Sequence, residues 1–86
     1  MFPVTKRRAD TLNLVAEQRV VRDIDNDTFD VVGGGIGWHA TALRHLAEFH
    51  EAGLIEDGEV LLSAGRRWQR LTVAGNYLLR RWHHGQ

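Results

Sequence analysis

Apolar residues recur at the spacing of an α-helix in three stretches of the chain. In residues 5–18, the side chains that share one helical face are Ala9, Leu12, Val15 and Ala16. The strongest pattern covers residues 38–52, where one side carries His39, Ala42, Leu43, Leu46, Phe49 and His50. In residues 72–82, the regularly spaced positions are Ala74, Leu78 and Trp82, with Tyr77 beside them. A period of 3.6 residues predicts three helices, each with one buried face.

The residues at the ends of these stretches suit helix termini. Thr5 and Thr72 stand where a side-chain oxygen can cap the first and the last helix. Gly53 follows the middle helix and can adopt the left-handed conformation of a C-cap, so that Leu54 and Ile55 continue into the core.

Two pairs of β-branched or aromatic runs lie between the helices. Residues 19–24 and 28–32 flank the turn-forming Asp25-Asn26-Asp27, which predicts a hairpin, with a short helix as the alternative. Residues 59–62 and 67–71 predict a second hairpin, whose tip is residues 63–66. The predicted order is helix, hairpin or short helix, helix, two-stranded hairpin, helix. This is an α+β fold in a single domain that covers residues 1–86.

Composition removes several classes of protein. The chain has 11 basic and 11 acidic residues, hence no net charge, and no cysteine. A disulfide framework, a thiolate metal site and a cysteine nucleophile are therefore excluded. No apolar stretch approaches the ~20 residues of a membrane span, and the N-terminus lacks a secretion signal. We expect a soluble cytoplasmic protein.

The charges are unevenly distributed along the chain. Residues 31–65 have a net charge of −4, whereas residues 66–86 contain five arginines and no acid. The cations Lys6-Arg7-Arg8 fall in the first turn of the first predicted helix, where they oppose the helix dipole. We expect them to serve a purpose other than stability, and a local positive surface can attract a polyanion although the whole protein is neutral.

The glycine-rich segment at residues 33–37 resembles a dinucleotide-binding loop. The pattern would place its third glycine at position 38, which is Trp38, and too little chain remains for such a sheet. No nucleophile with a neighbouring base is visible, and the five histidines lack ligand spacing. We therefore expect no enzyme, no cofactor and no metal site.

Residues 42–55 resemble the recognition helix of bacterial winged helix-turn-helix regulators, which ends in a similar Glu-Ala-Gly-Leu-Ile. In that family a wing hairpin follows, here residues 59–71, and then a closing Leu-Thr-x-x-Gly, here Leu71 to Gly75. The resemblance covers about residues 38–80. It departs upstream, because the family has a helix where residues 19–37 suggest strands and glycines.

The resemblance implies a small transcriptional regulator that binds duplex DNA. The small size and the lack of an effector domain suggest a phage or mobile-element type. The start of its helix would enter the major groove, with Thr41 and Arg44 outward and the wing tip beside them in one continuous cationic ridge. The expected DNA-binding residues are Trp38, Ala40, Thr41, Arg44, His45, Arg66, Arg67, Arg70, Lys6, Arg7 and Arg8. The alternatives are an ion pair of Arg44 with Glu48 and a solvated turn at Arg66-Arg67.

A homodimer is also expected, because a domain of this size gains from association. The candidate interface lies on the last helix and consists of Tyr77, Leu78, Leu79 and Trp82. The alternative for Trp82, as for the other two tryptophans, is that it completes a small core. Two-fold pairing would set two recognition helices about one DNA turn apart. A competing hypothesis is a protein-interaction module with the same fold, which the zero net charge favours.

Overall fold

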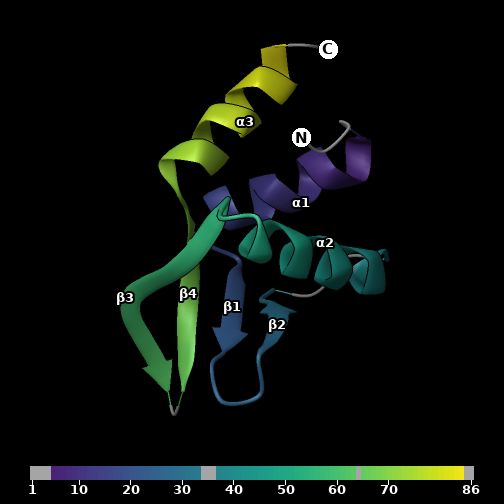
Figure 1. Ribbon diagram of the computed structural model, residues 1–86. Coiled ribbons are helices and arrows are strands. Elements are labelled where there is room, and N and C mark those ends of the chain that lie inside the picture. Colours follow the sequence, from purple (N-terminus) through teal and green to yellow (C-terminus); the bar gives the residue numbers. More distant parts are fainter. Residues whose placement is uncertain (1–4, 34–36, 64, 85–86) are drawn as a thin grey trace.

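The predicted elements occur in the computed structural model, which describes residues 5–33, 37–63 and 65–84. In these residues the chain forms three helices and four strands, arranged in space as in Figure 1. In chain order they are α1 (Lys6–Ala16), β1 (Val20–Asp23), β2 (Thr28–Val31), α2 (His39–Glu51), β3 (Ile55–Ser63), β4 (Arg66–Leu71) and α3 (Val73–His84). The α+β class is confirmed, and residues 19–32 form the hairpin, not the short helix. Residues 34–36 of the glycine run and residue 64 of the predicted tip lie outside the described residues.

Both hairpins belong to one antiparallel sheet, in the order β2-β1-β4-β3. Strand β1 pairs with β2 from Val20↔Val31 to Asp23↔Thr28, and with β4 from Val21↔Trp68 to Asp23↔Arg66. The long-range β1–β4 pairing joins the two hairpins side by side, so that both turns lie at the same end of the sheet (Figure 1).

Strand β3 begins at Ile55, earlier than the predicted start at Glu59. The sequence pattern was misleading because Glu56 and Asp57 interrupt the apolar run. Both acids are accommodated by partners on β4, since Glu56 pairs with Arg70 and Asp57 with Gln69. Pairing across the sheet therefore extends the strand through residues whose composition suggests a turn.

The predicted helix caps are confirmed. The Thr5 hydroxyl accepts a hydrogen bond from the Arg8 amide at 3.1 Å, and the Thr72 hydroxyl accepts one from the Gly75 amide at 3.0 Å. Gly53 has φ of 77°, the left-handed conformation expected after α2.

The core lies between the helices and one face of the sheet. Helix α1 contacts both α2 and α3, and the helices gather at the end of the sheet away from the two turns (Figure 1). The largest fully buried apolar side chains of this core are Leu12, Val15, Val20, Leu46, Phe49 and Ile55. No helix in the described ranges has the length and apolar character needed to cross a bilayer.

Helix α3 closes the core with residues that the sequence assigned to a dimer interface. Leu78, Leu79 and Trp82 are all buried within the single chain, and the Trp82 ring lies 6.2 Å from that of Phe49, centroid to centroid. That assignment was wrong for these three residues, because a single 86-residue domain needs them for its own core. Only Tyr77 of the four is exposed.

Candidate nucleic-acid interface

Helix α2 turns one line of side chains outward. Ala42, His45, Leu46 and Phe49 are buried against α1 and the sheet, whereas the opposite line is exposed. The residues of this outward line are Ala40, Arg44, Ala47 and Glu51. Two alanines beside one arginine leave the helix backbone accessible to a large partner surface.

His45 is buried, at 7% exposure, so the predicted outward position of this residue was wrong. Its ring stacks on Phe49 with centroids 6.2 Å apart, and its Nδ1 lies 3.5 Å from a Glu48 carboxylate oxygen. The physical reason is that α1 packs on this side of α2, since α1 contributes Arg8 to the same Glu48 at 3.8 Å. Thr41 lies on the same flank and is half-buried.

Arg44 is exposed, and no described residue forms a hydrogen bond or ion pair with its guanidinium. The spacing along the sequence suggested an ion pair with Glu48, which follows Arg44 by one helical turn. Glu48 instead contacts Arg8 and His45. The Arg44 charge is therefore open to solvent or to a ligand.

The first turn of α1 lies at the start of α2. The Arg7 guanidinium stands over the Trp38 ring, 4.9 Å from its centroid. Asp10 is the acid nearest to this turn, 3.3 Å from the Lys6 amine and 4.0 Å from Arg7. We call this surface the α1–α2 face, formed by Lys6, Arg7, Trp38, Ala40, Thr41 and Arg44. It contains Lys6 and Arg7 of the first helix and Arg44 of the predicted recognition helix, whereas Arg8 contacts Glu48.

The tip of the β3–β4 hairpin lies against the β1–β2 turn. The Ile24 amide donates to the Gly65 carbonyl oxygen at 2.8 Å, and Arg66 pairs with Asp23 in the ladder. Hydrogen bonds from Asn26, with a smaller contribution from the charge of Arg66, lower the pKa of Asp23. The positive charge of Arg66, although exposed, thus stands beside acids of its own chain.

The other two arginines of β4 also have partners within the chain. Arg67 donates through Nη1 to the Gly58 carbonyl oxygen at 3.2 Å, and Arg70 donates through Nε to Glu56 at 2.8 Å. Successive strand residues point to opposite faces. Arg66 and Arg70 therefore lie on the sheet face opposite Gln69, whose partner Asp57 is near His50 of α2.

The single cationic ridge expected from the sequence is consequently absent from the described residues. Strands β2 and β1 lie between the start of α2 and the β3–β4 hairpin (Figure 1), and their turn carries the exposed acids Asp25 and Asp27. The α1–α2 face remains as a candidate surface, with Lys6, Arg7 and Arg44 against the neighbouring Asp10.

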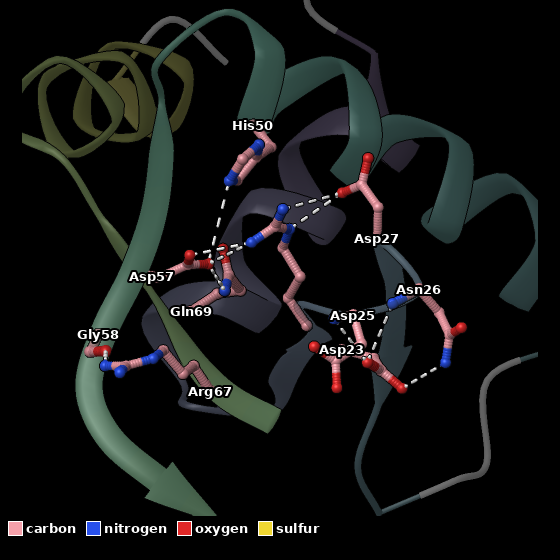
Figure 2. Close-up of polar contacts among 10 residues, drawn as sticks. Asp23, Asp25, Asn26, Asp27, His50, Asp57, Gly58, Arg67 and Gln69 are labelled. Atoms are coloured by element: carbon pink, nitrogen blue, oxygen red, sulfur yellow. Dashed lines mark hydrogen bonds and ion pairs between the residues drawn. The ribbon is translucent and has the colours of Figure 1, made fainter. Parts of the chain in front are cut away.

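A polar network that the sequence did not suggest connects β1, β3, β4 and α2 (Figure 2). The Arg22 guanidinium donates to Asp57 at 2.9 Å and lies 3.0 Å from Asp27, while the Gln69 amide donates to Asp57 at 2.8 Å. His50 Nε2 is 4.0 Å from the same Asp57. These partners come together only through the strand pairing, so no spacing along the chain could have revealed them.

The pKa values in this network favour the charged forms. Burial opposes the charge of Arg22, but the hydrogen bond with Asp27 and the charge of Asp57 outweigh it and raise the Arg22 pKa. Burial likewise opposes ionisation of Asp57, yet the Gln69 hydrogen bond and the charge of Arg22 lower its pKa. The arrangement is that of a structural ion pair, with both charges satisfied.

The described residues contain no group of three or more histidines and carboxylates placed to hold a metal ion. Comparison with models of protein families, with curated protein sequences and with solved structures found no match. The chain is thus defined by its architecture, a small α+β fold with three helices and a four-stranded antiparallel sheet in the residues described.

Proposed function

We propose that this chain is a small DNA-binding protein of winged-helix type, a transcription regulator that presents α2 to duplex DNA. The observation that carries the proposal is the exposed Arg44 guanidinium, unpaired among the described residues, on the α1–α2 face. An arginine in that state retains its full charge and its fork of donors for a ligand.

The surroundings of Arg44 suit a duplex. Ala40 and Ala47 are small, so the outward line of α2 can approach the floor of a groove closely. Arg44 can then donate two hydrogen bonds to a guanine edge. Lys6 and Arg7, at the near end of α1, are placed to neutralise phosphates on the flanking strand.

The arrangement around α2 supports the winged-helix comparison. A hairpin, β3–β4, follows α2 directly, and β4 pairs with a strand that precedes α2 in the chain. The β1–β2 hairpin occupies the place in the chain where that family has a supporting helix. In this proposal the wing arginines contribute little, since Arg67 and Arg70 have partners within the chain and Arg66 stands beside Asp23.

The second candidate function is a protein-interaction module. It is favoured by the exposed Asp25 and Asp27 in the β1–β2 turn, which would repel phosphate, and by the zero net charge. In that case the α1–α2 face would bind an acidic surface of another protein.

Fluorescence anisotropy with a labelled random-sequence duplex distinguishes DNA binding from the protein-interaction module. We expect binding at low salt, with the logarithm of the affinity falling linearly as the logarithm of salt concentration rises. Replacing Lys6 and Arg7 with Ala should reduce the magnitude of that log–log slope by about two, one unit for each lost phosphate contact. Absence of binding at low ionic strength would overturn the DNA proposal in favour of the interaction module.

The matched pair of variants is Arg44→Ala and Arg70→Ala. Both remove one positive charge, but Arg70 is paired with Glu56 on the other face of the sheet. Arg44→Ala should weaken binding several-fold more than Arg70→Ala. Equal losses would mean that only net charge matters and would contradict a role for α2.

A further inference from the structure

A cavity of about 570 Å³ opens where the C-terminal end of α1, strand β4 and the first turn of α3 meet. Its volume lies within the range of about 300–1,000 Å³ that is typical of small-molecule sites. Its lining combines apolar side chains, side-chain amides and an indole. The residues that matter here are Ala16, Gln18, Trp68, Arg70, Leu71 and Asn76.

Gln18 has a backbone conformation that its residue type disfavours. It follows Glu17, the C-cap of α1, and its φ of 59° lies in the left-handed region. Its amide donates to the Val15 carbonyl oxygen at 3.0 Å, and the Arg19 amide donates to that of Leu14 at 3.1 Å. Glycine is the usual residue in this pattern of hydrogen bonds, because a side chain makes the left-handed conformation unfavourable.

The end of α2 shows the alternative within the same chain. There the Gly53 amide donates to His50 at 3.1 Å and the Leu54 amide donates to Phe49 at 2.9 Å, with a φ of 77° at Gly53. The chain therefore has glycine at this position after α2 and glutamine after α1. The Gln18 side chain is exposed and has no hydrogen bond to any described residue that would offset its cost. This contrast indicates that the Gln18 side chain serves a ligand.

The side chains around the cavity suit a flat heterocyclic ring. Trp68 is half-buried on β4, and an indole stacks well on aromatic rings. The Asn76 side chain is exposed on α3 and, like that of Gln18, has no hydrogen-bond partner in the described part of the chain. A side-chain amide offers a donor beside an acceptor, which matches the edge of a nucleobase.

The charges near the cavity favour a neutral ligand. Of the described residues that line it, Arg70 alone is charged, and its Nε donates to Glu56 at 2.8 Å. Glu17, next to Gln18, accepts a hydrogen bond from Asn13 and forms no ion pair with a described cation. A phosphate group in the cavity would therefore meet carboxylates and no unpaired cation.

We infer that this cavity binds a free purine base or nucleoside. The ring stacks on Trp68, and the amides of Gln18 and Asn76 hold its polar edge, while Ala16 and Leu71 supply apolar contacts. The inference does not depend on DNA binding, since the cavity lies at the opposite end of α1 from Lys6 and Arg7, and its tests need no duplex.

Isothermal titration calorimetry with adenosine and guanosine tests the site. The wild type should bind at least one of the two nucleosides. Gln18→Gly should weaken that binding tenfold or more and yet raise the urea midpoint of unfolding, because glycine suits the left-handed position. A structural role alone would not separate binding from stability in this way.

Two further variants complete the titration. Asn76→Ala, which suits a helix, should weaken binding several-fold, and Arg44→Ala on α2 should leave it unchanged. No binding by the wild type at millimolar nucleoside would overturn the inference. Binding that survives Gln18→Gly, or a Gln18→Gly protein no more stable than the wild type, would overturn it as well.

Phosphorylated ligands test the choice of a free, neutral nucleoside. Adenosine 5′-monophosphate and a six-residue single strand of deoxyadenosine should bind no more tightly than adenosine. Tighter binding of the strand would show that the cavity takes an unpaired base of a nucleic acid and would overturn the assignment. NMR gives the location: adenosine should shift the indole N–H signal of Trp68 and not that of Trp38. The reverse result would also contradict the site.

Discussion

The α1–α2 face carries two arginines and the sheet carries four, and the two sets differ in whether their charges have partners within the chain. On the sheet, Arg22, Arg67 and Arg70 donate to acceptors of the same chain, and Arg66 stands beside Asp23. On the α1–α2 face, Arg44 has no such partner in the described part of the chain. The difference teaches that the number of arginines in a segment does not define an anion-binding surface. What decides is whether strand pairing has already supplied a carboxylate or a carbonyl oxygen.

The largest expected effect comes from breaking the polar network around Arg22 and Asp57. Arg22→Ala removes a side chain that is only 14% exposed and leaves Asp57 without its cation. We expect a loss of about 2–3 kcal/mol in the free energy of unfolding, measured by urea denaturation. This is below the figure for a fully buried pair, because Asp57 is one-third exposed.

Urea denaturation of variants at two other arginines tests whether paired and unpaired arginines differ in their contribution to stability. Arg70→Ala breaks an exposed ion pair and should cost no more than about 1 kcal/mol. Arg44→Ala should change the stability by no more than about 0.5 kcal/mol. Equal losses for all three variants would contradict the division between structural and free arginines.

The second expected effect is on the pH dependence of stability. The pKa of Asp57 is lowered in the folded state relative to the unfolded chain. Its contribution is therefore complete above the unfolded pKa of about 4 and is lost as the pH falls through and below that value. Urea denaturation from neutral to acidic pH should show a steeper loss for the wild type than for Asp57→Asn. Parallel curves would mean that this carboxylate is not stabilised by Arg22 and Gln69.

The smallest expected effect tests the acids that adjoin the α1–α2 face. Asp30 on β2 lies 3.8 Å from His39, at the start of α2, and its side chain is half-exposed. Asp30→Asn removes a negative charge that would repel phosphate and should raise the affinity for duplex DNA about twofold. The control is Glu17→Gln, an equal charge change at the exposed C-terminal end of α1. An equal gain in DNA affinity for both variants would show that binding depends only on net charge and not on the position of Asp30.

Local patterns in the sequence predicted much of the fold because the signals are themselves local. The caps at Thr5, Thr72 and Gly53 act on adjacent backbone groups, and the Asp25-Asn26-Asp27 turn fixes its own hairpin. The start of β3 was missed because Glu56 and Asp57 depend on partners from β4, which only the sheet supplies.

The candidate site was predicted less completely than the fold. Ala40 and Arg44 are outward as the helical period requires, but His45 is covered because α1 crosses that side of α2. The period assigns a residue to a side of its helix; it does not say which neighbouring element packs there. For the same reason, the apolar residues of α3 could not be divided between core and interface until the position of α1 was known.

The central claim is that DNA is bound by the α1–α2 face and not by the hairpin end. Backbone amide chemical shifts, followed by NMR as a short duplex is added, test it residue by residue. The account predicts that the shifts concentrate at Lys6, Arg7, Ala40, Thr41 and Arg44, with little change at Asp25 or Gly65. Shifts centred on Gly65 and Arg66, or no shifts at low salt, would contradict it.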